Sequence, residues 1–476
     1  MGDASSSSTE VQMASFQIEA AEWSQEQFAD CQLGDRRRTK RLIKVAEQVT
    51  NDPSASFPDQ MKSWGDLKAA YRLFDCEDVT FEAIAGPHWR QTRAVEPGRY
   101  LVLADTTEID FGYHREIDGL SEIGNGSGRG FLLHNGLLVE AESQSVIGVA
   151  GQTIHYRKPK PKKENAAQRV KRQRESRVWG DLIDQIGPPG EGVQLVHVCD
   201  RGADDFEVFC HLQQNHGDWV VRAASLHRHV ITPGDEKMPL QEYLGSLPVA
   251  GQYELSLRAR PGQPARTATL EVSFGRLAMP IPKHKSSYVK SLDPQPIEMS
   301  VVWVREIDAP VEASAIEWVL YTSLPITTFE EAWQAVSDYE CRWLVEEYHK
   351  ALKTGCSVQR RLLRETDRLE AMVGLMSVVS VRLLQLKSVA RSDPDRPARD
   401  VVPRLWLLML KAVRKKLRRV HDLTIYEFYR EVAKLGGFLG RRSDGEPGWI
   451  TIWRGWEKLN TLVQGAQLAI ELKKCG

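Results

Sequence analysis

The stretch that decides the fold runs from Tyr339 to Lys353 and reads YECRWLVEEYHKALK. If it forms one helix, Tyr339, Arg342, Glu346 and Lys353 fall on a single stripe. His349 lies on the same stripe. A carboxylate flanked by two cations and a phenol makes a poor core and suits a metal ion beside a phosphodiester. The stripe therefore predicts that two further carboxylates come from elsewhere in the chain.

Two aspartates are candidates for those carboxylates. Asp105 ends the apolar run LVLAD, and Asp200 ends the apolar run LVHVCD. An acid at the end of a buried strand is a suitable ligand for a hard divalent cation. Either aspartate taken alone would more often only cap the next turn or helix. Together with the stripe they predict that Asp105, Asp200 and Glu346 converge on two Mg²⁺ ions, with Mn²⁺ able to substitute. One ion would activate a water or a 3′-hydroxyl and the other would stabilise the leaving oxygen.

Other residues beside the predicted acids have less certain roles in the sequence, and two of them leave alternatives open. Glu347 points about 100° away from Glu346, so we expect it to be solvated. His349 and Lys350 either support the site from behind or lie on the surface. Thr106 and Thr107, which follow Asp105, are expected to be strand or turn residues.

The charge of the chain is balanced overall but clustered locally. Its 476 residues contain 63 Lys+Arg and 64 Asp+Glu, for a formal net charge of -1. Basic residues gather in the segments 34–50, 157–177 and 411–419. One such run is usually a solvated face. Three of them beside a candidate metal site favour a nucleic-acid partner, because local charge decides phosphate binding. The segment 157–177 either follows a DNA backbone or forms a mobile loop.

Cysteine spacing and hydropathy indicate a reducing, aqueous compartment. The seven cysteines include no CxxC pair, so neither a disulfide framework nor a zinc site is predicted. No signal peptide and no apolar run of about 18 residues is found. We therefore expect a soluble, intracellular protein.

The pattern of apolar residues predicts an α/β protein with helical regions at both ends. We expect a disordered polar tail (1–18) before a helical module (19–90). Strand-like runs, helices and the aspartates then predict a ribonuclease H-like catalytic core (91–225), interrupted by an inserted β-rich subdomain (226–327). The core resumes with the glutamate helix (328–390), and a helical region (391–476) ends the chain.

Several motifs together resemble the DDE transposases of the insertion-sequence-four superfamily, and most closely the Tn-five transposase. They are LGDRRR (33–38), ADTT around Asp105, CDRGAD around Asp200, RWLVEEYHKALKTG around Glu346, and LGGFLG…GWITIWRGWEKL near the C-terminus. The resemblance covers residues 19–467, nearly the whole chain. It implies that Asp105, Asp200 and Glu346 are the metal ligands.

The resemblance also implies roles for residues around the metal site. Tyr339, Arg342, Lys353 and Arg222 match positions that contact phosphates of the transposon end, and Trp318 matches a tryptophan that receives a flipped base. The N-terminal module would recognise the terminal inverted repeat. Its candidate DNA contacts are Arg36, Arg37, Arg38, Lys40 and Arg41.

The aromatic stripe Trp449, Trp453 and Trp456 matches a dimerisation region, although such a stripe on its own is more often internal core. The resemblance implies a homodimer that pairs two transposon ends and joins them to target DNA. It also implies the cytoplasm of a bacterium, at the nucleoid.

The sequence therefore predicts a cut-and-paste DNA transposase that acts through a hairpin intermediate. One rival is a DNA-binding inhibitor of transposition, which the intact LGDRRR motif disfavours. The other is a ribonuclease H-like structure-specific nuclease that cuts DNA without strand transfer.

Overall fold

We describe the protein from a computed structural model. It covers residues 20–112, 117–158, 163, 176–257, 264–310, 314–400, 402–441 and 444–475, without the side chains of 386, 389–392, 449, 471, 474 and 475. The predicted polar tail (1–18) and most of the basic segment 157–177 lie outside these residues.

The N-terminal part is helical and packs on a long helix from far along the chain. It consists of α2 (Ala20–Phe28), α3 (Arg36–Asn51), α4 (Phe57–Gln60), α5 (Trp64–Phe74) and α6 (Phe81–Arg93). Asp35, Ser56, Ser63 and Thr80 cap α3 to α6 by accepting backbone N–H groups of the first turn. Gly374 of α14 (Thr366–Ser392) lies so close to Phe81 that a Cβ would come within 3.0 Å of the Phe81 carbonyl oxygen. This contact joins α6 closely to α14.

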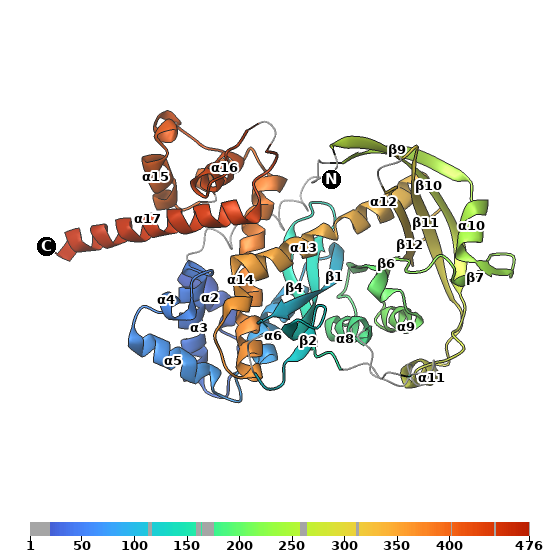
Figure 1. Cartoon of the computed structure of the whole chain (residues 1–476), viewed down its shortest axis with the longest axis horizontal. Helices are drawn as coiled ribbons and strands as arrows, with labels where there is room; N and C mark the ends of the chain where they lie inside the picture. Colours follow the sequence, from blue (N-terminus) through green and yellow to red (C-terminus); the bar gives the residue numbers. More distant parts are fainter. Residues whose placement is uncertain are drawn as a thin grey trace.

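A single mixed sheet of twelve strands forms the centre of the molecule and its right-hand side in Figure 1. Its order is β2-β3-β1-β5-β6-β12-β11-β10-β7-β8, with β4 added to β3 and β9 added to β10. The strands are β1 (Gly98–Asp110), β2 (Ser121–Ile123), β3 (Gly128–Glu140), β4 (Val146–His155), β5 (Val193–Cys199), β6 (Asp218–Arg222), β7 (His229–Ile231), β8 (Lys237–Pro239), β9 (Val249–Leu257), β10 (Arg266–Met279), β11 (Ile297–Ile307) and β12 (Glu317–Thr322).

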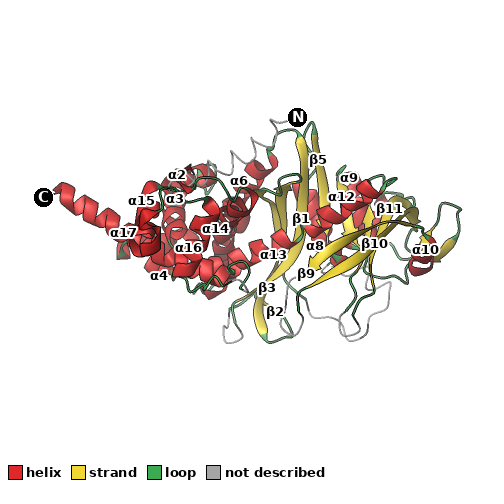
Figure 2. Cartoon of the chain, turned by 90° about the horizontal axis from the view of Figure 1, so that it is seen from above, coloured by secondary structure: helices red, strands yellow, loops and turns green. Residues whose placement is uncertain are grey.

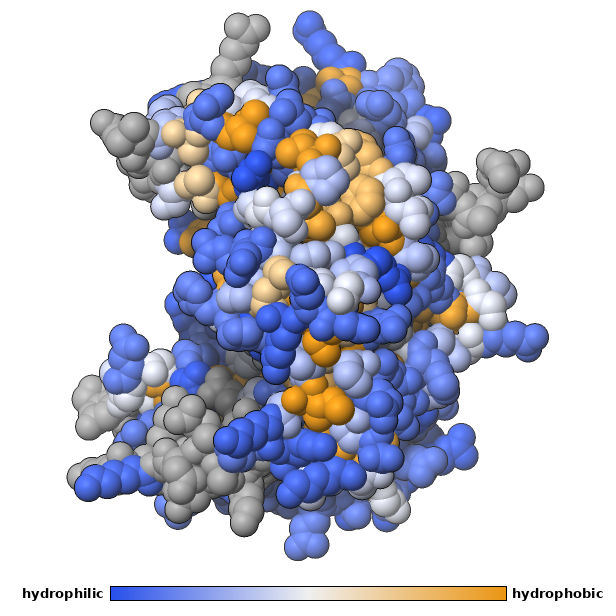
Figure 3. Space-filling view, turned by 90° about the vertical axis from the view of Figure 1, so that its right-hand side faces the viewer, coloured by the Kyte–Doolittle hydropathy of each residue, from blue (hydrophilic) through white to orange (hydrophobic). Residues whose placement is uncertain are grey.

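Only the central strands of this sheet are parallel. β1 pairs with β5, and β5 pairs with β6, in parallel, whereas the other pairs are antiparallel. The strands of residues 226–327 do not form a separate sheet, because β12 pairs with β6 and continues the central one. Figure 2 shows the strands in yellow, with β1 and β5 in the middle of the molecule and β10 and β11 toward its right-hand side. Figure 3 looks onto the end that these strands build, where hydrophilic residues surround small separate groups of apolar ones.

Alternation along the strands creates a core on each face of the sheet. Leu101 and Leu103 of β1 pack into one core, while Val102 and Ala104 pack into the other. Helices α8 (Arg177–Ile186) and α9 (Phe206–Gln214) cover the second face. Helices α12 (Phe329–Glu340) and α13 (Trp343–Lys350) cover the first, which therefore carries the Tyr339–Lys353 run. Short helices α10 (Leu240–Ser246) and α11 (Ser287–Ser291) lie among the later strands.

The Tyr339–Lys353 run is not the one regular helix that we predicted. α12 ends at Glu340, α13 begins at Trp343, and the chain continues from Ala351 to Gly355 as a π-helical turn, η2. Cys341 and Arg342 keep right-handed helical dihedral angles, so the interruption does not reverse the direction of the chain. A 3₁₀ turn, η3 (Val358–Arg360), then leads to α14.

The C-terminal part has its own small core. It contains η4 (Ala398–Asp400), α15 (Arg404–Val413), η5 (Lys415–Arg419), α16 (Ile425–Leu435) and α17 (Trp449–Cys475). Trp453 is buried, and the Trp456 ring lies 4.3 Å from that of Trp406. The two tryptophans therefore pack within the chain, while α17 leaves Leu468, Ile470 and Leu472 exposed further along. Figure 1 shows this helix running out to the C-terminal end of the molecule. No helix in the described ranges is both long and apolar enough to cross a bilayer.

Candidate active site

Strand register places Asp105 and Asp200 next to each other. Ala104 of β1 is the parallel partner of Cys199 of β5, and each aspartate is the next residue along its strand. Neighbouring strands lie about 4.8 Å apart. Both side chains point to the face that α12 and α13 cover, because Leu103 and Val198, two residues earlier, pack into that core. We predicted that this strand ends at Asp105. β1 instead runs on to Asp110 beside β3.

Arg342 links Glu346 to Asp105. One nitrogen of the Arg342 guanidinium, Nη1, donates to Oδ2 of Asp105 at 3.0 Å. The other, Nη2, donates to Oε1 of Glu346 at 2.6 Å. One turn of helix separates Arg342 from Glu346, so both face the sheet from the same side. The first turn of α13 thus brings the third acid toward the two strand aspartates.

The three acids affect one another electrostatically. The pKa of Asp105 is raised to about 6, mainly by burial. Arg342 and the Thr106 N–H act to lower it, and the charges of Asp200 and Glu346 act to raise it. Asp200 accepts the Gly202 N–H at 2.7 Å, and Glu346 is exposed. A cluster of carboxylates with one shared cation favours the binding of further positive charge.

The other predicted residues lie on the same side of the sheet. The Tyr339 and Trp318 rings are 5.9 Å apart. Arg222, at the end of β6, is a diagonal neighbour of Trp318 across the β6–β12 pair and donates to the Glu317 carbonyl at 3.1 Å. Burial lowers the pKa of the Lys353 ammonium, while Glu108, Asp110 and Asp105 act to raise it, so Lys353 lies near these acids. These residues therefore share the face of the sheet that carries the acids.

The acids fit a hard divalent cation by residue type, but they are not arranged around one. Carboxylate oxygens are the ligands that Mg²⁺ prefers. Within the described residues, however, no group of three His, Cys, Asp or Glu side chains is placed to hold a metal ion. The Arg342 guanidinium instead bridges Asp105 and Glu346. A metal ion held by all three acids would require Arg342 to leave this position.

A buried polar layer that the sequence analysis missed lies directly behind the acids. Asn135 is the cross-strand partner of Asp105, and it bonds to Nε2 of His349 at 3.0 Å and to the Gln152 amide at 2.6 Å. His134 lies 2.7 Å from the Thr106 hydroxyl. Burial lowers the pKa of both His134 and His349 to about 3, so both rings are neutral at physiological pH. His349 therefore supports the site from behind; the one signal for the layer is the polar pair His-Asn inside the apolar strand FLLHNGLLVE.

The prediction that Glu347 is solvated was wrong. Glu347 is buried and forms ion pairs with Lys387 of α14 and with Lys350, the latter at 2.9 Å. Glu347 therefore lies in the interior, whereas the preceding residue, Glu346, is exposed.

The N-terminal arginines have different surroundings. Arg38 pairs with Asp78 at 2.5 Å and donates to the Leu33 carbonyl, and Arg41 pairs with Asp66 at 3.1 Å. Arg37 pairs with its own helix cap, Asp35, at 2.8 Å but stays 91% exposed. Arg36 and Lys40 are exposed on α3.

An aromatic residue nearby was not predicted. Trp64, the first residue of α5, is 69% exposed, and the Lys68 ammonium lies 5.1 Å from its ring centre. It breaks no periodic pattern, so the sequence alone gave no reason to single it out.

Two protein-family models match the chain, one at each end. The model described as "Transposase DNA-binding" covers residues 20–79, which are helices α2 to α5. The model described as "Transposase Tn5 dimerisation domain" covers residues 378–476, from the later part of α14 to the C-terminus. The central sheet with its acids lies between the two matched regions.

Proposed function

We propose that this chain, whose two matched domains support a Tn5-like transposase, is a cut-and-paste enzyme whose single active site contains Asp105, Asp200 and Glu346. The two matches agree with the insertion-sequence-four superfamily. The two domains provide for DNA binding and for a homodimer. We also propose that the region between the two domains is a ribonuclease H-like core, which carries out the chemistry.

One observation carries the proposal. Two aspartates from adjacent parallel strands and a glutamate from the covering helix share one face of the sheet, and Arg342 links two of the three. Ligands of open α/β sheets bind beyond the carboxyl ends of parallel strands. A transposase needs a site that cuts and joins phosphodiesters, and these are the acids that the fold brings together at that edge.

We assign the acids to a divalent metal ion, Mg²⁺ or Mn²⁺, with two ions per site. Such ions activate the attacking oxygen and stabilise the leaving one. Arg342, Lys353, Tyr339 and Arg222 would hold phosphates of the transposon end, arginine as a fork and lysine as a point charge. Trp318 would receive an unstacked base beside Tyr339.

The proposed reaction has four steps. Water first attacks the phosphodiester at the transposon end and frees a 3′-hydroxyl. That hydroxyl attacks the opposite strand and closes a hairpin, a second water opens the hairpin, and the 3′-hydroxyl then attacks target DNA. No step forms a covalent bond between DNA and protein.

The test is a cleavage assay on DNA that carries the element's own ends, with Mg²⁺ and purified protein. Denaturing gels should show a nick, a hairpin and then joined target DNA. Asp105→Ala should lose all three products while it still binds the end DNA. Cutting by Asp105→Ala at the wild-type rate would remove Asp105 from the site.

The same gels separate the rival functions. A nuclease without strand transfer would give cut ends but no joined product. An inhibitor would give no product and would suppress an active transposase in a mixing experiment.

A further inference from the structure

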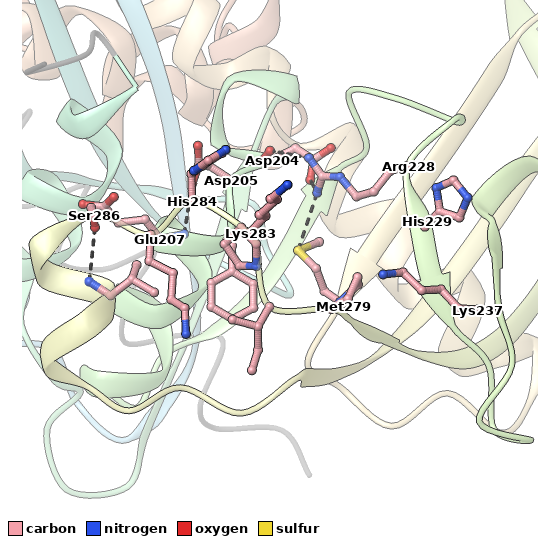
Figure 4. A pocket seen from close by; sticks show the side chains of 16 residues that line it. Asp204, Asp205, Glu207, Arg228, His229, Lys237, Met279, Lys283, His284 and Ser286 are labelled. Atoms are coloured by element: carbon pink, nitrogen blue, oxygen red, sulfur yellow. Dashed lines mark hydrogen bonds and ion pairs between the residues drawn. The ribbon is translucent and has the colours of Figure 1, made fainter. Parts of the chain in front are cut away.

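Two groups of polar side chains lie outside the three acids. One lines a cavity of about 680 Å³ on the face of the sheet that α8 and α9 cover, since its lining residues Phe206 and Val289 belong to the core on that face. Figure 4 shows Arg228 beside Asp204 in the wall of this cavity. The sheet separates the cavity from the acids. The other group is the buried polar layer behind Asp105, which lies on the same face as the acids.

Asn135 of this layer stands opposite Asp105 in the sheet. The two are direct partners in the antiparallel β1–β3 pair, so their side chains leave the sheet on the same face, with Cβ atoms about 5 Å apart. Both contact α13 there, because Asp105 bonds to Arg342 at the start of the helix and Asn135 bonds to His349 near its end. Glu346 lies between these two contacts, four residues after Arg342 and three before His349. The segment that carries the third acid is therefore tied to the sheet on both sides.

The direction of the hydrogen bonds in the layer is fixed by its outermost member. The indole N–H of Trp89 in α6, which can only donate, bonds to Oε1 of Gln152 at 3.2 Å. Gln152 therefore turns its amide NH₂ group to Oδ1 of Asn135, at 2.6 Å. The Asn135 NH₂ group in turn donates to the Leu133 carbonyl and to Nε2 of His349, both at 3.0 Å. Nε2 of His349 is thus the acceptor, and both amide hydrogens of Asn135 are used.

The two contacts of α13 with the sheet differ in permanence. Arg342 has to leave its position before a metal ion can bind all three acids. Asn135 and His349 are buried, and Gln152 bonds both to Asn135 and, at 3.2 Å, to the hydroxyl of Tyr348 beside His349. Buried polar networks whose groups all have partners are rigid. The contact at His349 can therefore hold α13 in place after the guanidinium has moved.

We propose that Asn135 and His349 are positioning residues, whose hydrogen bond keeps Glu346 within reach of a divalent cation bound by Asp105 and Asp200. The proposal rests on the proposed function, because it takes the three acids as metal ligands. In this role neither residue touches the ion or the DNA, and both act through Glu346. β3 and the end of α13, which lie outside both matched family domains, thereby contribute to the site.

The experiment places two amides of different length at position 349. The Gln side chain can bring an acceptor to the Asn135 NH₂ group, whereas the Asn side chain is one methylene shorter and falls short of it. Binding of Mn²⁺ to the DNA-free protein is measured by titration calorimetry. His349→Asn should bind Mn²⁺ roughly tenfold more weakly than wild type, as expected when the support behind a metal ligand is lost. His349→Gln should keep the wild-type affinity.

His88→Asn is the matched control. His88 is also buried, and its Nε2 also accepts an amide hydrogen, from the Val149 N–H at 3.2 Å. Its other printed-ring contacts are to Gln27 and Thr92, which lie outside the layer. His88→Asn should lower the thermal unfolding temperature and leave the Mn²⁺ affinity unchanged. This comparison separates a loss of stability from a loss of position.

A double-mutant cycle determines whether the effect passes through Glu346. In a Glu346→Ala background His349→Asn should have no further effect on Mn²⁺ affinity, because the residue that it positions is absent. Asn135→Ala removes the other half of the bond and should show the same loss and the same dependence on Glu346. Wild-type affinity in His349→Asn and Asn135→Ala, or an equal loss with and without Glu346, would overturn the proposal.

Failure of the proposed function would look different. A wild-type protein that binds Mn²⁺ through Glu346 and yet cuts no end DNA would refute the transposase chemistry, and the role of the two positioning residues would stand. A wild-type protein that binds no Mn²⁺ would refute the metal site and the positioning role together.

Discussion

Arg342 and Asp105 are joined across the sheet–helix boundary, with Nη1 of Arg342 3.0 Å from Oδ2 of Asp105. The same guanidinium holds Glu346, so one positive group lies between two of the three acids. A metal ion bound by all three acids would require this side chain to move away from Asp105 and Glu346. A DNA phosphate offers the guanidinium another partner, which would couple DNA binding to metal binding.

Removing this side chain should therefore improve metal binding without DNA. We expect DNA-free Arg342→Ala to bind Mn²⁺ roughly tenfold more tightly than wild type, equivalent to about 1.4 kcal/mol. Titration calorimetry measures this directly. The control is Arg305→Ala, because Arg305 pairs with Glu271 on the later strands, at 2.9 Å. Equal Mn²⁺ affinity in Arg342→Ala and wild type would show that Arg342 does not compete for the acids.

The raised pKa of Asp105 predicts a pH-dependent effect of its replacement. Its pKa is about 6 in the folded chain and about 3.9 when unfolded. Between these values the folded state holds a proton that the unfolded state has lost, so this group's contribution to stability declines as the pH rises through the window. In a chelating buffer, Asp105→Asn should be more stable than wild type at pH 7.5, by about 3 kcal/mol at most.

That difference should nearly disappear at about pH 3, where Asp105 is protonated in the folded state and mostly protonated in the unfolded state. Thermal unfolding of the two proteins at several pH values measures it. A stability difference that does not change with pH would contradict the assignment of the shift to Asp105.

The buried amide behind the acids should matter for stability as well as for geometry. Asn135→Ala leaves His349 and Gln152 without a partner that they have in the native chain. We expect it to lower the free energy of unfolding by about 1–3 kcal/mol. Asn215→Ala is the control, because Asn215 bonds to Asp184 at a partly exposed helix end. Chemical denaturation of both variants tests this, and an equal loss in the two would argue against a special role for Asn135.

The adjacent glutamates should respond in opposite ways to the same change. Glu347→Ala leaves Lys387 buried without this ion-pair partner, which costs about 3–5 kcal/mol for a buried pair. Glu346→Ala removes an exposed carboxylate and should change stability by less than about 1 kcal/mol while it abolishes DNA cleavage. Unfolding assays measure the stability of the two variants, and cleavage assays measure their activity. A stable Glu347→Ala protein would contradict the buried ion pair.

The residues of the candidate site could be singled out from the sequence more readily than the bounds of the elements that carry them. Asp105, Asp200 and Arg342 were identifiable because acids after apolar strands and charges at helical spacing are local patterns. That Arg342 bridges Asp105 and Glu346 was not predictable, since it depends on how α13 crosses β1. The break between α12 and α13 left no Pro or Gly in the sequence to mark it.

Features that depend on tertiary contacts were missed or predicted wrongly. Helical spacing alone made Glu347 a surface residue, but α14 supplies Lys387 to neutralise it inside the protein. How the strands of 226–327 join the rest of the fold was not predicted: β12 pairs with β6 and extends the central sheet. Pairing between strands about 100 residues apart cannot be read from local patterns.

The most direct test of the central claim is an experimental structure of the protein with end DNA and Mn²⁺, using anomalous scattering to locate the metal. The account predicts manganese between the carboxylates of Asp105, Asp200 and Glu346, with Arg342 turned away toward a DNA phosphate. Manganese bound elsewhere, or an Arg342 that still bridges Asp105 and Glu346 while the DNA is cut, would contradict it.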